Sequence, residues 1–395
     1  MNRTSYLEQA SRKSEQYHAR YGNKPWKANC YFLLWNLAQL IPFRRSMRPK
    51  SDNVCRIGVA LKGGVGDMLI TLNYLQSLHQ FLGGNLVFDL YVKKKRGLCE
   101  IVQTLCQEQH FVKQVFPASQ LKRDYDLYVD MIRYPDILYC NESKIRSLSP
   151  KLHQWCLTVD QFRKDNPIVY RSGTHGDFIG MKLAILQGHN RLQQANVDSL
   201  VPVESIFQPK ILVDPRETLN KFSLGNTRFI TMNRGIGHMG SNDSTRLWPH
   251  QHYETLARLI KERMPDVKLV QVGTKGRVFI NGIDEDLRGK TSFEEVMVLM
   301  KQSSCHIDGE CGLVHLRHFL HGGTSVVLFG PTDERFLGYA ENINIRSDAC
   351  PGGCEWITAN YNAKCPRGFK ENECLSRLLP EEVLSHVIKT LETKP

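Results

Sequence analysis

Residues 55–82 read CRIGVALKGGVGDMLITLNYLQSLHQFL, and this stretch decides the fold class of the 395-residue chain. It opens with a short apolar run, CRIGVAL, whose β-branched residues are typical of a buried strand. The glycine-rich KGGVGD follows, and the rest carries apolar residues at helical spacing. We therefore expect a strand, a turn and a helix, an arrangement that brings backbone N–H groups and a helix N-terminus close to a ligand.

Strands and helices alternate in two separate parts of the chain. After residue 82, NLVFDLYV and YDLYVDM read as strands around the helical LCEIVQTLCQEQ, and a second series runs from RFITMNRG to PEEVLSHVIKTL. Such alternation favours a parallel sheet in each part. We predict an α/β chain of two Rossmann-like domains facing a central cleft, where ligands bind at the carboxyl ends of the strands.

The expected boundaries are an N-terminal basic and amphipathic extension at residues 1–53, a first domain at 54–220 and a second domain at 221–395. Between residues 134 and 213 the pattern gives only helical pieces, followed by a strand-like KILVD. We expect this region to pack on the first domain and to line one side of the cleft.

The charge balance favours anionic partners. The chain has 52 basic and 40 acidic residues, a net charge of +12, which suits sugar nucleotides, phospholipid head groups or nucleic acid. It contains no RNA-binding aromatic motif, basic zipper or paired Cys/His finger spacing, so we expect no nucleic-acid partner. With 41% hydrophobic residues the composition is that of a folded soluble protein, neither disordered nor membrane-spanning.

The N-terminal residues 1–26 are polar and begin no apolar run. We therefore expect no cleaved secretory signal, a cytoplasmic location and twelve reduced cysteines. A run from Tyr31 to Phe43 is apolar between basic flanks and about half of the roughly 20 residues needed to cross a bilayer. Two interpretations stay open: it lies in the interface of an anionic inner leaflet, or it packs as a helix on the first domain.

The glycine-rich turn singles out Asp67. The glycines at 63, 64 and 66 match neither the dinucleotide fingerprint nor the phosphate loop that ends in Gly-Lys-Ser/Thr. Asp67 stands at the start of the expected helix and at the mouth of the cleft. Its carboxylate is suited to accept a proton from a hydroxyl group as a general base, and it is equally suited to cap the helix.

Residues 306–336 read HIDGECGLVHLRHFLHGGTSVVLFGPTDERF. An acidic residue, a small residue and Gly precede His-Leu, and an apolar strand with Phe-Gly-Pro-Thr follows. This pattern resembles the signature of glycosyltransferase family 9. Residues 56–71 resemble the family's N-terminal element of strand, turn, Gly-Asp and helix, and residues 246–249, RLWP, resemble its motif of a basic residue, any residue and Trp-Pro. The chain is thus similar to the ADP-heptose lipopolysaccharide heptosyltransferases.

The resemblance implies the GT-B arrangement of two Rossmann-like domains, inverting transfer of heptose from ADP-heptose, and no cofactor for catalysis. Asp67 takes the role of the base, and Arg246 stands where the family has a Lys that contacts the donor phosphates. Glu310 replaces the usual Asp. The residues implied at the donor are Ser241, Asn242, Arg246, Glu310, Cys311, Gly312, Leu313, His315 and Thr332, and those in the acceptor-side loop are Lys62, Gly63, Gly64 and Gly66.

Some of these side chains also have a purely structural interpretation. His315 is typical of a hydrogen-bonded histidine inside a helix, and we expect it to hold no proton in catalysis. We expect Trp248 and Phe329 to be core or wall residues. Cys350, Cys354, Cys365 and Cys374 have the spacing C-x3-C-x10-C-x8-C, which allows a structural zinc or iron site or a set of buried unligated thiols, and both stay open.

We therefore expect an enzyme, peripheral on the cytoplasmic face of the inner membrane, that moves a heptose or similar sugar from a nucleotide diphosphate donor to an anionic, lipopolysaccharide-type glycolipid. One alternative keeps the chemistry and changes the acceptor to a protein hydroxyl, as in the autotransporter heptosyltransferases. Another is a noncatalytic GT-B-fold assembly partner, against which the intact Asp67 and Arg246 argue.

Overall fold

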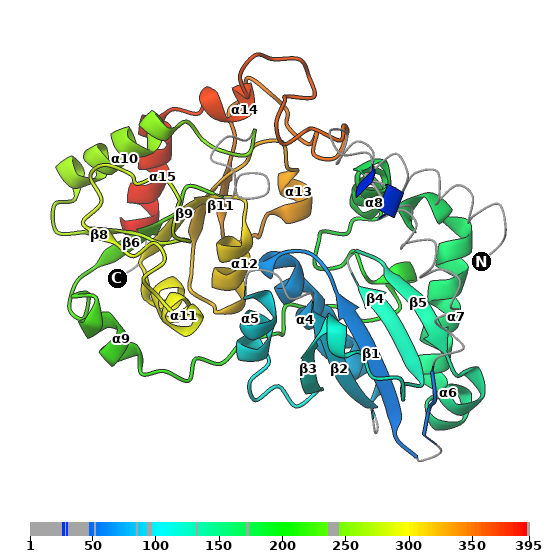
Figure 1. Ribbon diagram of the computed structural model, residues 1–395. Helices are drawn as coiled ribbons and strands as arrows, with labels where there is room; N and C mark the ends of the chain where they lie inside the picture. Colours follow the sequence, from blue (N-terminus) through cyan, green and yellow to red (C-terminus); the bar gives the residue numbers. More distant parts are fainter. Residues whose placement is uncertain are drawn as a thin grey trace.

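A computed structural model describes residues 26–27, 29–30, 47–50, 53–83, 86–92, 97–131, 133–170, 174–235 and 245–392. These residues form two α/β domains that meet along a continuous apolar interface (Figure 1). The predicted α/β class with two sheets is therefore confirmed. The segment Tyr31–Phe43 lies outside the described residues.

The first sheet has the order β3-β2-β1-β4-β5. Its strands pair in parallel, except that β5 runs antiparallel to β4. The strands are β1 (Cys55–Leu61), β2 (Leu86–Val92), β3 (Val112–Pro117), β4 (Leu127–Met131) and β5 (Pro135–Cys140). Helices at residues 65–82 and 98–105 connect β1 to β2 and β2 to β3, because parallel neighbours need a crossover connection.

The helices of the first domain are α4 (Val65–Leu82), α5 (Leu98–Leu105), α6 (Glu142–Leu148), α7 (Pro150–Asp165) and α8 (Thr174–Leu186). Helix α4 follows β1 directly and is buried over most of its length. Helix α7 begins at Ser149, whose Oγ accepts a hydrogen bond from the backbone N–H of Leu152, with Pro150 in the first turn. In the core the indole N–H of Trp155 donates to the hydroxyl of Tyr74 at 2.9 Å.

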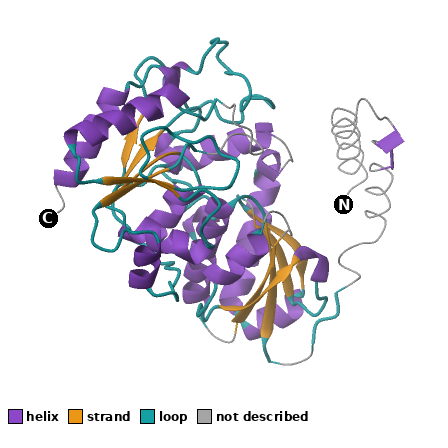
Figure 2. Cartoon of the chain, turned by 60° about the vertical axis from the view of Figure 1, so that its left-hand side comes forward, coloured by secondary structure: helices purple, strands orange, loops and turns teal. Residues whose placement is uncertain are grey.

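The second sheet has the order β11-β10-β9-β6-β7-β8, and every neighbouring pair is parallel. The strands are β6 (Phe229–Met232), β7 (Lys268–Gln271), β8 (Glu285–Asp286), β9 (Cys305–Gly309), β10 (Ser325–Leu328) and β11 (Ile343–Ile345). The helices are α9 (Pro215–Lys221), α10 (His250–Arg263), α11 (Phe293–Gln302), α12 (Gly312–Phe319), α13 (Glu334–Leu337), α14 (Glu373–Ser376) and α15 (Pro380–Glu392). Figure 2 shows helices packed around both sheets.

Two details differ from the sequence prediction. The strand-like KILVD at 210–214 is not a strand, because it lies in the connection between the domains and pairs with neither sheet. The predicted boundary at residue 220 falls within α9, and α9 packs against α11 of the second domain. No described helix is long and apolar enough to cross a membrane.

The connection between the domains is held to both of them. The side-chain oxygen of Asn73, on α4, accepts hydrogen bonds from the backbone N–H groups of Ile206 and Phe207 at 2.9 and 3.0 Å. The ring of Phe207 packs edge-on between Phe111 of the first domain and Phe319 of the second. These contacts fix the connection against α4 and help to set how the domains face each other.

The start of α4 touches the start of α12, and two glycines permit this approach (Figure 1). A Cβ atom on Gly66 would collide with the ring of His315. A Cβ on Gly312 would lie 3.3 Å from both the backbone nitrogen of Gly66 and the Cβ of Val65. Two helix N-termini from different domains are therefore brought to one place, which is a favourable environment for an anion.

We predict that Gly66→Ala lowers the free energy of unfolding by about 1–3 kcal/mol, since an added methyl group overpacks a buried contact that His315 cannot easily leave. Gly64→Ala is the matched control, because a Cβ there meets nothing within 4 Å. Chemical or thermal unfolding of the two variants measures the difference. Equal stability of both variants would contradict the close packing described for Gly66.

Candidate active site

A cleft of about 780 Å³ lies between the domains where α4 and α12 begin. Both domains and the segment that follows β11 contribute to its walls. It brings together ten of the residues singled out from the sequence, namely Gly63, Gly64, Gly66, Asp67, Arg246, Glu310, Cys311, Gly312, Leu313 and His315. The sequence motifs, which are up to about 250 positions apart, therefore converge on one site.

Asp67 both caps α4 and faces the cleft. Its Oδ2 accepts a hydrogen bond from the backbone N–H of the N-cap residue Gly64 at 3.0 Å, which is the carboxylate half of a capping box. Its Oδ1 pairs with Arg191 at 2.9 Å, and the side chain of Asp67 remains 39% exposed. Gly63 has φ of +110°, and a Cβ there would collide with the Asp67 carboxylate, so the turn requires glycine at this position. The capping interpretation is confirmed, and the side chain is still open to a ligand.

Arg246 stands between two carboxylates of the second domain. Its guanidinium pairs with the carboxylate of Glu310, donates to the Glu310 backbone carbonyl at 3.0 Å, and lies 3.6 Å from Oε1 of Glu355. Burial alone would lower the pKa of Arg246, but Glu310 and Glu355 outweigh it and raise that pKa. The cation is thus permanent, which suits binding of phosphate oxygens.

The two carboxyl groups beside Arg246 differ in protonation. Burial would raise the pKa of Glu310, but the charge of Arg246 and the hydrogen bond with His315 hold it below its ordinary value. Burial raises the pKa of Glu355 to about 7, and the negative charge of Glu310 adds to the rise, whereas Arg246 opposes it. Glu310 is therefore ionised, whereas Glu355 is present in both its protonated and its ionised form near neutral pH.

His315 is buried in α12 and has partners on both ring nitrogens. Nε2 lies 3.2 Å from Oε1 of Glu310, and Nδ1 lies 2.6 Å from the hydroxyl of Tyr339. This is the hydrogen-bonded helix histidine expected from the sequence, although its ring also borders the cleft. Trp248 and Phe329 are buried core residues, as expected, and the Trp248 indole N–H donates to the Leu378 carbonyl at 2.9 Å.

Four predicted residues are not placed in the cleft. Lys62 does not line it and pairs instead with Asp130 on β4. Thr332 is also outside its lining, with a side chain that is 1% exposed. Ser241 and Asn242 lie outside the described residues.

Several cleft residues were not found from the sequence. On the side near Asp67 these are Arg133 and Arg191. On the side of the second domain they are Lys275, Arg277, Thr291, Ser292 and Phe293, and from the cysteine-rich segment come Glu355, Trp356 and Tyr361. Thr291 and Ser292 lie just before α11. Ser292 and Glu295 form a capping box, and this sequence pattern is the one that could have indicated a helix N-terminus at these residues.

The cysteine-rich segment, residues 350–374, holds its thiols near one another. Burial and the neighbouring thiols of Cys365 and Cys350 raise the pKa of Cys354, and burial together with Cys350 and Cys354 raises the pKa of Cys374 to about 12. All twelve cysteines of the chain are free of disulfides. Within the described ranges, no three Cys, His, Asp or Glu side chains lie in positions that would hold a metal ion.

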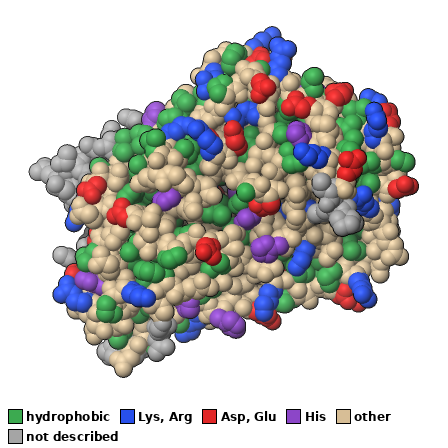
Figure 3. Space-filling model, turned by 180° about the vertical axis from the view of Figure 1, so that it is seen from behind, with side chains coloured by type: hydrophobic (Ala, Val, Ile, Leu, Met, Phe, Trp, Pro, Cys, Tyr) green, Lys and Arg blue, Asp and Glu red, His purple; other side chains and the backbone are tan. Residues whose placement is uncertain are grey.

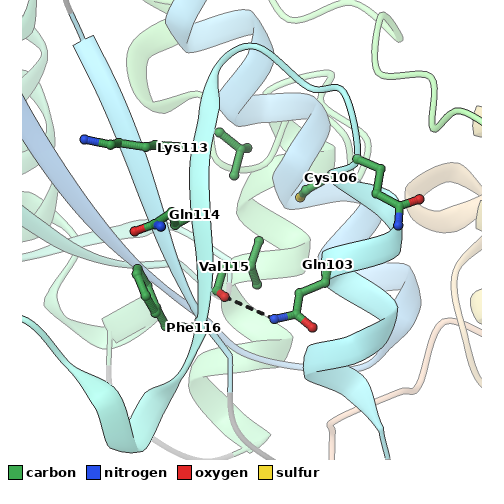
Figure 4. A pocket seen from close by; sticks show the side chains of 8 residues that line it. Gln103, Cys106, Lys113, Gln114, Val115 and Phe116 are labelled. Atoms are coloured by element: carbon green, nitrogen blue, oxygen red, sulfur yellow. Dashed lines mark hydrogen bonds between the residues drawn. The ribbon is translucent and has the colours of Figure 1, made fainter.

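A second hollow, of about 260 Å³, lies between α5 and β3 (Figure 4). Gln103 closes one side by donating to the Val115 carbonyl at 3.3 Å, and burial raises the pKa of the Cys106 thiol to about 12. It is lined by no carboxylate and no reactive thiolate. Figure 3 shows Lys and Arg side chains spread among acidic ones on the face seen there, without one continuous basic patch. The interdomain cleft is therefore the candidate active site.

Comparison with known protein families supports this choice. Residues 216–355, which carry Arg246, Glu310 and the start of α12, match the family model described as Glycosyltransferase family 9 (heptosyltransferase). The chain carries a glycosyltransferase family 9 domain. It is accordingly a glycosyltransferase, and the resemblance inferred from the motifs is confirmed. No curated protein sequence matches the chain.

Solved structures share the fold of this protein. Escherichia coli ADP-heptose lps heptosyltransferase II is 14% identical with a TM-score of 0.51, and the match covers 86% of this chain and 99% of that one. A family 9 glycosyl transferase from Veillonella parvula is 14% identical with a TM-score of 0.53, and the match covers 87% of this chain and 99% of that one. The dodecameric iron-containing heptosyltransferase TibC, in complex with ADP-D-beta-D-heptose, is 15% identical with a TM-score of 0.52. This match covers 88% of this chain and 78% of that one. The GT-B arrangement is thus confirmed.

We predict that Arg246→Met destabilises the protein on the order of 3 kcal/mol, because it leaves two carboxyl groups without their cation. Adding Glu310→Gln should restore much of this loss, since it removes the carboxylate that is most strongly paired with Arg246. Thermal unfolding of the single and double variants measures both effects. A single variant as stable as the native protein would show that the charge cluster does not hold the site together.

Proposed function

We propose that this protein is an inverting heptosyltransferase that moves a heptose, or a similar sugar, from ADP-heptose to an anionic, lipopolysaccharide-type glycolipid. The observation that carries the proposal is the convergence, in one cleft, of an exposed carboxylate on one domain and an arginine beside a helix N-terminus on the other. Of the three similar structures named above, one is an ADP-heptose lps heptosyltransferase and another is in complex with ADP-D-beta-D-heptose.

The donor diphosphate would bind at Arg246 and at the N-terminus of α12. A guanidinium and free backbone N–H groups are both suited to phosphate oxygens, and Gly312 leaves the helix start uncovered by a side chain. Farther along the second-domain wall, Phe293 and Val296 of α11 offer an apolar surface for the base, near the polar Lys275 and Arg277. With the base at that surface, the phosphates would lie beside Arg246 and the sugar would face the first domain.

Catalysis would divide between the two walls. Asp67 would take the proton from the acceptor hydroxyl as its oxygen attacks the anomeric carbon from the face opposite the diphosphate, so that the configuration inverts. As the bond to the diphosphate breaks, negative charge grows on the departing oxygen. Arg246 and the start of α12 would stabilise that charge, an interaction stronger in the transition state than in the ground state.

The acceptor side supports an anionic partner. Arg133 and Arg191 line the cleft near Asp67, and burial together with the charge of Arg191 lowers the pKa of Arg133 to about 10. Each guanidinium carries five N–H donors, so an anionic group could bind beside the Asp177 and Asp67 carboxylates that already pair with Arg133 and Arg191. We propose that this group belongs to a glycolipid at the cytoplasmic face of the inner membrane, which the net charge of +12 also suits.

A second candidate acceptor is a protein hydroxyl, as in the autotransporter heptosyltransferases. The cysteine-rich segment beside the cleft favours it, because the fold is shared with the iron-containing TibC. Incubating the purified protein with ADP-heptose and either a lipopolysaccharide-type glycolipid or an autotransporter passenger protein tests both. We expect heptose on the glycolipid, detected by mass spectrometry. Heptose found only on the passenger protein would show that the acceptor is a protein hydroxyl and not the glycolipid. Transfer to neither would refute the proposed function.

We predict that Asp67→Asn reduces the rate of transfer by about 10²–10⁴-fold, because an amide cannot accept the proton. Asparagine can still accept the Gly64 N–H but loses the ion pair with Arg191, so we expect a modest loss of stability and little change in affinity for the donor. Steady-state kinetics with thermal unfolding of the same preparation measure this. Full transfer activity in a normally folded variant would show that Asp67 is not the base.

The cysteine-rich segment is proposed to bind a structural zinc or iron ion through Cys350, Cys354, Cys365 and Cys374. Its thiols are neighbours, though they are not in positions to hold an ion in the described structure, so binding would draw the segment closer together. We predict about one metal equivalent per chain by elemental analysis, and its loss in Cys354→Ser but not in the exposed control Cys30→Ser. Metal-free protein with an ordered segment would contradict the proposal.

A further inference from the structure

Glu355 reaches the cleft from the cysteine-rich segment, directly after Cys354. The backbone N–H groups of Cys354 and Glu355 both donate to the Pro331 carbonyl, at 2.8 and 2.9 Å, which fixes this part of the segment to the loop after β10. The Glu355 residue is only 2% exposed and still borders the cleft. A carboxyl group this deeply buried needs partners on its oxygens.

Among the described residues, one of the two carboxyl oxygens of Glu355 has hydrogen-bond or ion-pair partners and the other has none. Oε1 accepts a hydrogen bond from the Tyr361 hydroxyl at 3.3 Å and lies 3.6 Å from Nη1 of Arg246. Oε2 is buried and has no hydrogen-bond partner among the described residues. Leaving a buried polar atom unpaired is unfavourable, so a partner from a ligand would be favoured here.

Glu355 shares the cleft with residues from both halves of the proposed reaction. Its Oε1 lies 3.6 Å from Nη1 of Arg246 on the phosphate side, and Asp67 of the acceptor side lines the same cleft. Arg133 also lines this cleft and lies 5.4 Å from the ring of Trp356, the residue after Glu355. The transferred sugar must occupy this region, since it joins the diphosphate to the attacking hydroxyl.

We propose that Glu355 binds a hydroxyl group of the transferred sugar and thereby helps to determine which donor sugar the enzyme accepts. The inference rests on the proposed transfer from a nucleotide sugar. A sugar hydroxyl can donate to a carboxylate or accept from a carboxylic acid, so either protonation state of Glu355 forms the bond. A phosphate is a poorer partner, because a carboxylate beside Arg246 repels it and competes for the same cation.

The test compares the complete donor with its nucleotide alone. Calorimetric titration with ADP-heptose and with ADP is performed on the native protein and on Glu355→Gln and Glu355→Ala. We expect Glu355→Ala to bind ADP-heptose about 10-fold or more weakly, the effect of losing one hydrogen bond to a buried charged group. ADP should bind equally well or more tightly, because a negative charge beside Arg246 is gone. Glu355→Gln keeps the shape and should fall between the two.

Glu371→Gln is the control, because Glu371 is exposed in the same segment and does not line the cleft. Equal weakening of ADP and ADP-heptose would show that Glu355 only supports the fold of the site. Unchanged affinity for both, or a large fall in kcat with affinity unchanged, would also overturn the inference. If Glu355→Ala does not fold, the same comparison in Glu355→Gln decides. Absence of binding of either ligand to the native protein would refute the proposed function and this inference with it.

Discussion

The contact between the first turns of α4 and α12 sets the geometry of the whole site. The ring of His315 lies so close to Gly66 that a side chain on residue 66 would collide with it. Gly312 lies against the backbone of Gly66. Because each helix follows the end of a central strand, their contact brings the carboxyl edges of the two sheets together. Asp67 on one helix and the N-terminus of the other therefore face the same cleft.

Electrostatics then divides the cleft into regions with different chemistry. Arg246 contacts two carboxyl groups in the second domain. One of them, Glu310, pairs with Arg246 and forms a hydrogen bond with His315. The other, Glu355, keeps an unused oxygen. In the proposed reaction an incoming diphosphate would compete with these carboxylates for Arg246, which would supply the positive charge where negative charge develops. The cysteine-rich segment belongs to this arrangement, since it supplies Glu355 and Tyr361 to the wall.

Local pattern was sufficient for most of the architecture and for the residues that lie at strand ends. Asp67 and Gly312 follow buried strands directly, so sequence order alone places them at the cleft. Glu355 could not be found in this way, because it lies in a segment without periodic hydrophobicity and reaches the cleft only through tertiary folding. KILVD was misassigned for the opposite reason: a short apolar run has strand character, but no strand lies beside it to pair with.

The central claim is that this cleft binds a nucleotide sugar across the meeting point of the two domains. Isothermal titration of the native protein with ADP-heptose, and with UDP- and GDP-linked sugars at equal concentration, measures it most directly. We expect saturable binding of ADP-heptose that free ADP displaces, with little heat from the other donors. Binding of a UDP- or GDP-sugar with none of ADP-heptose would contradict the account of the donor.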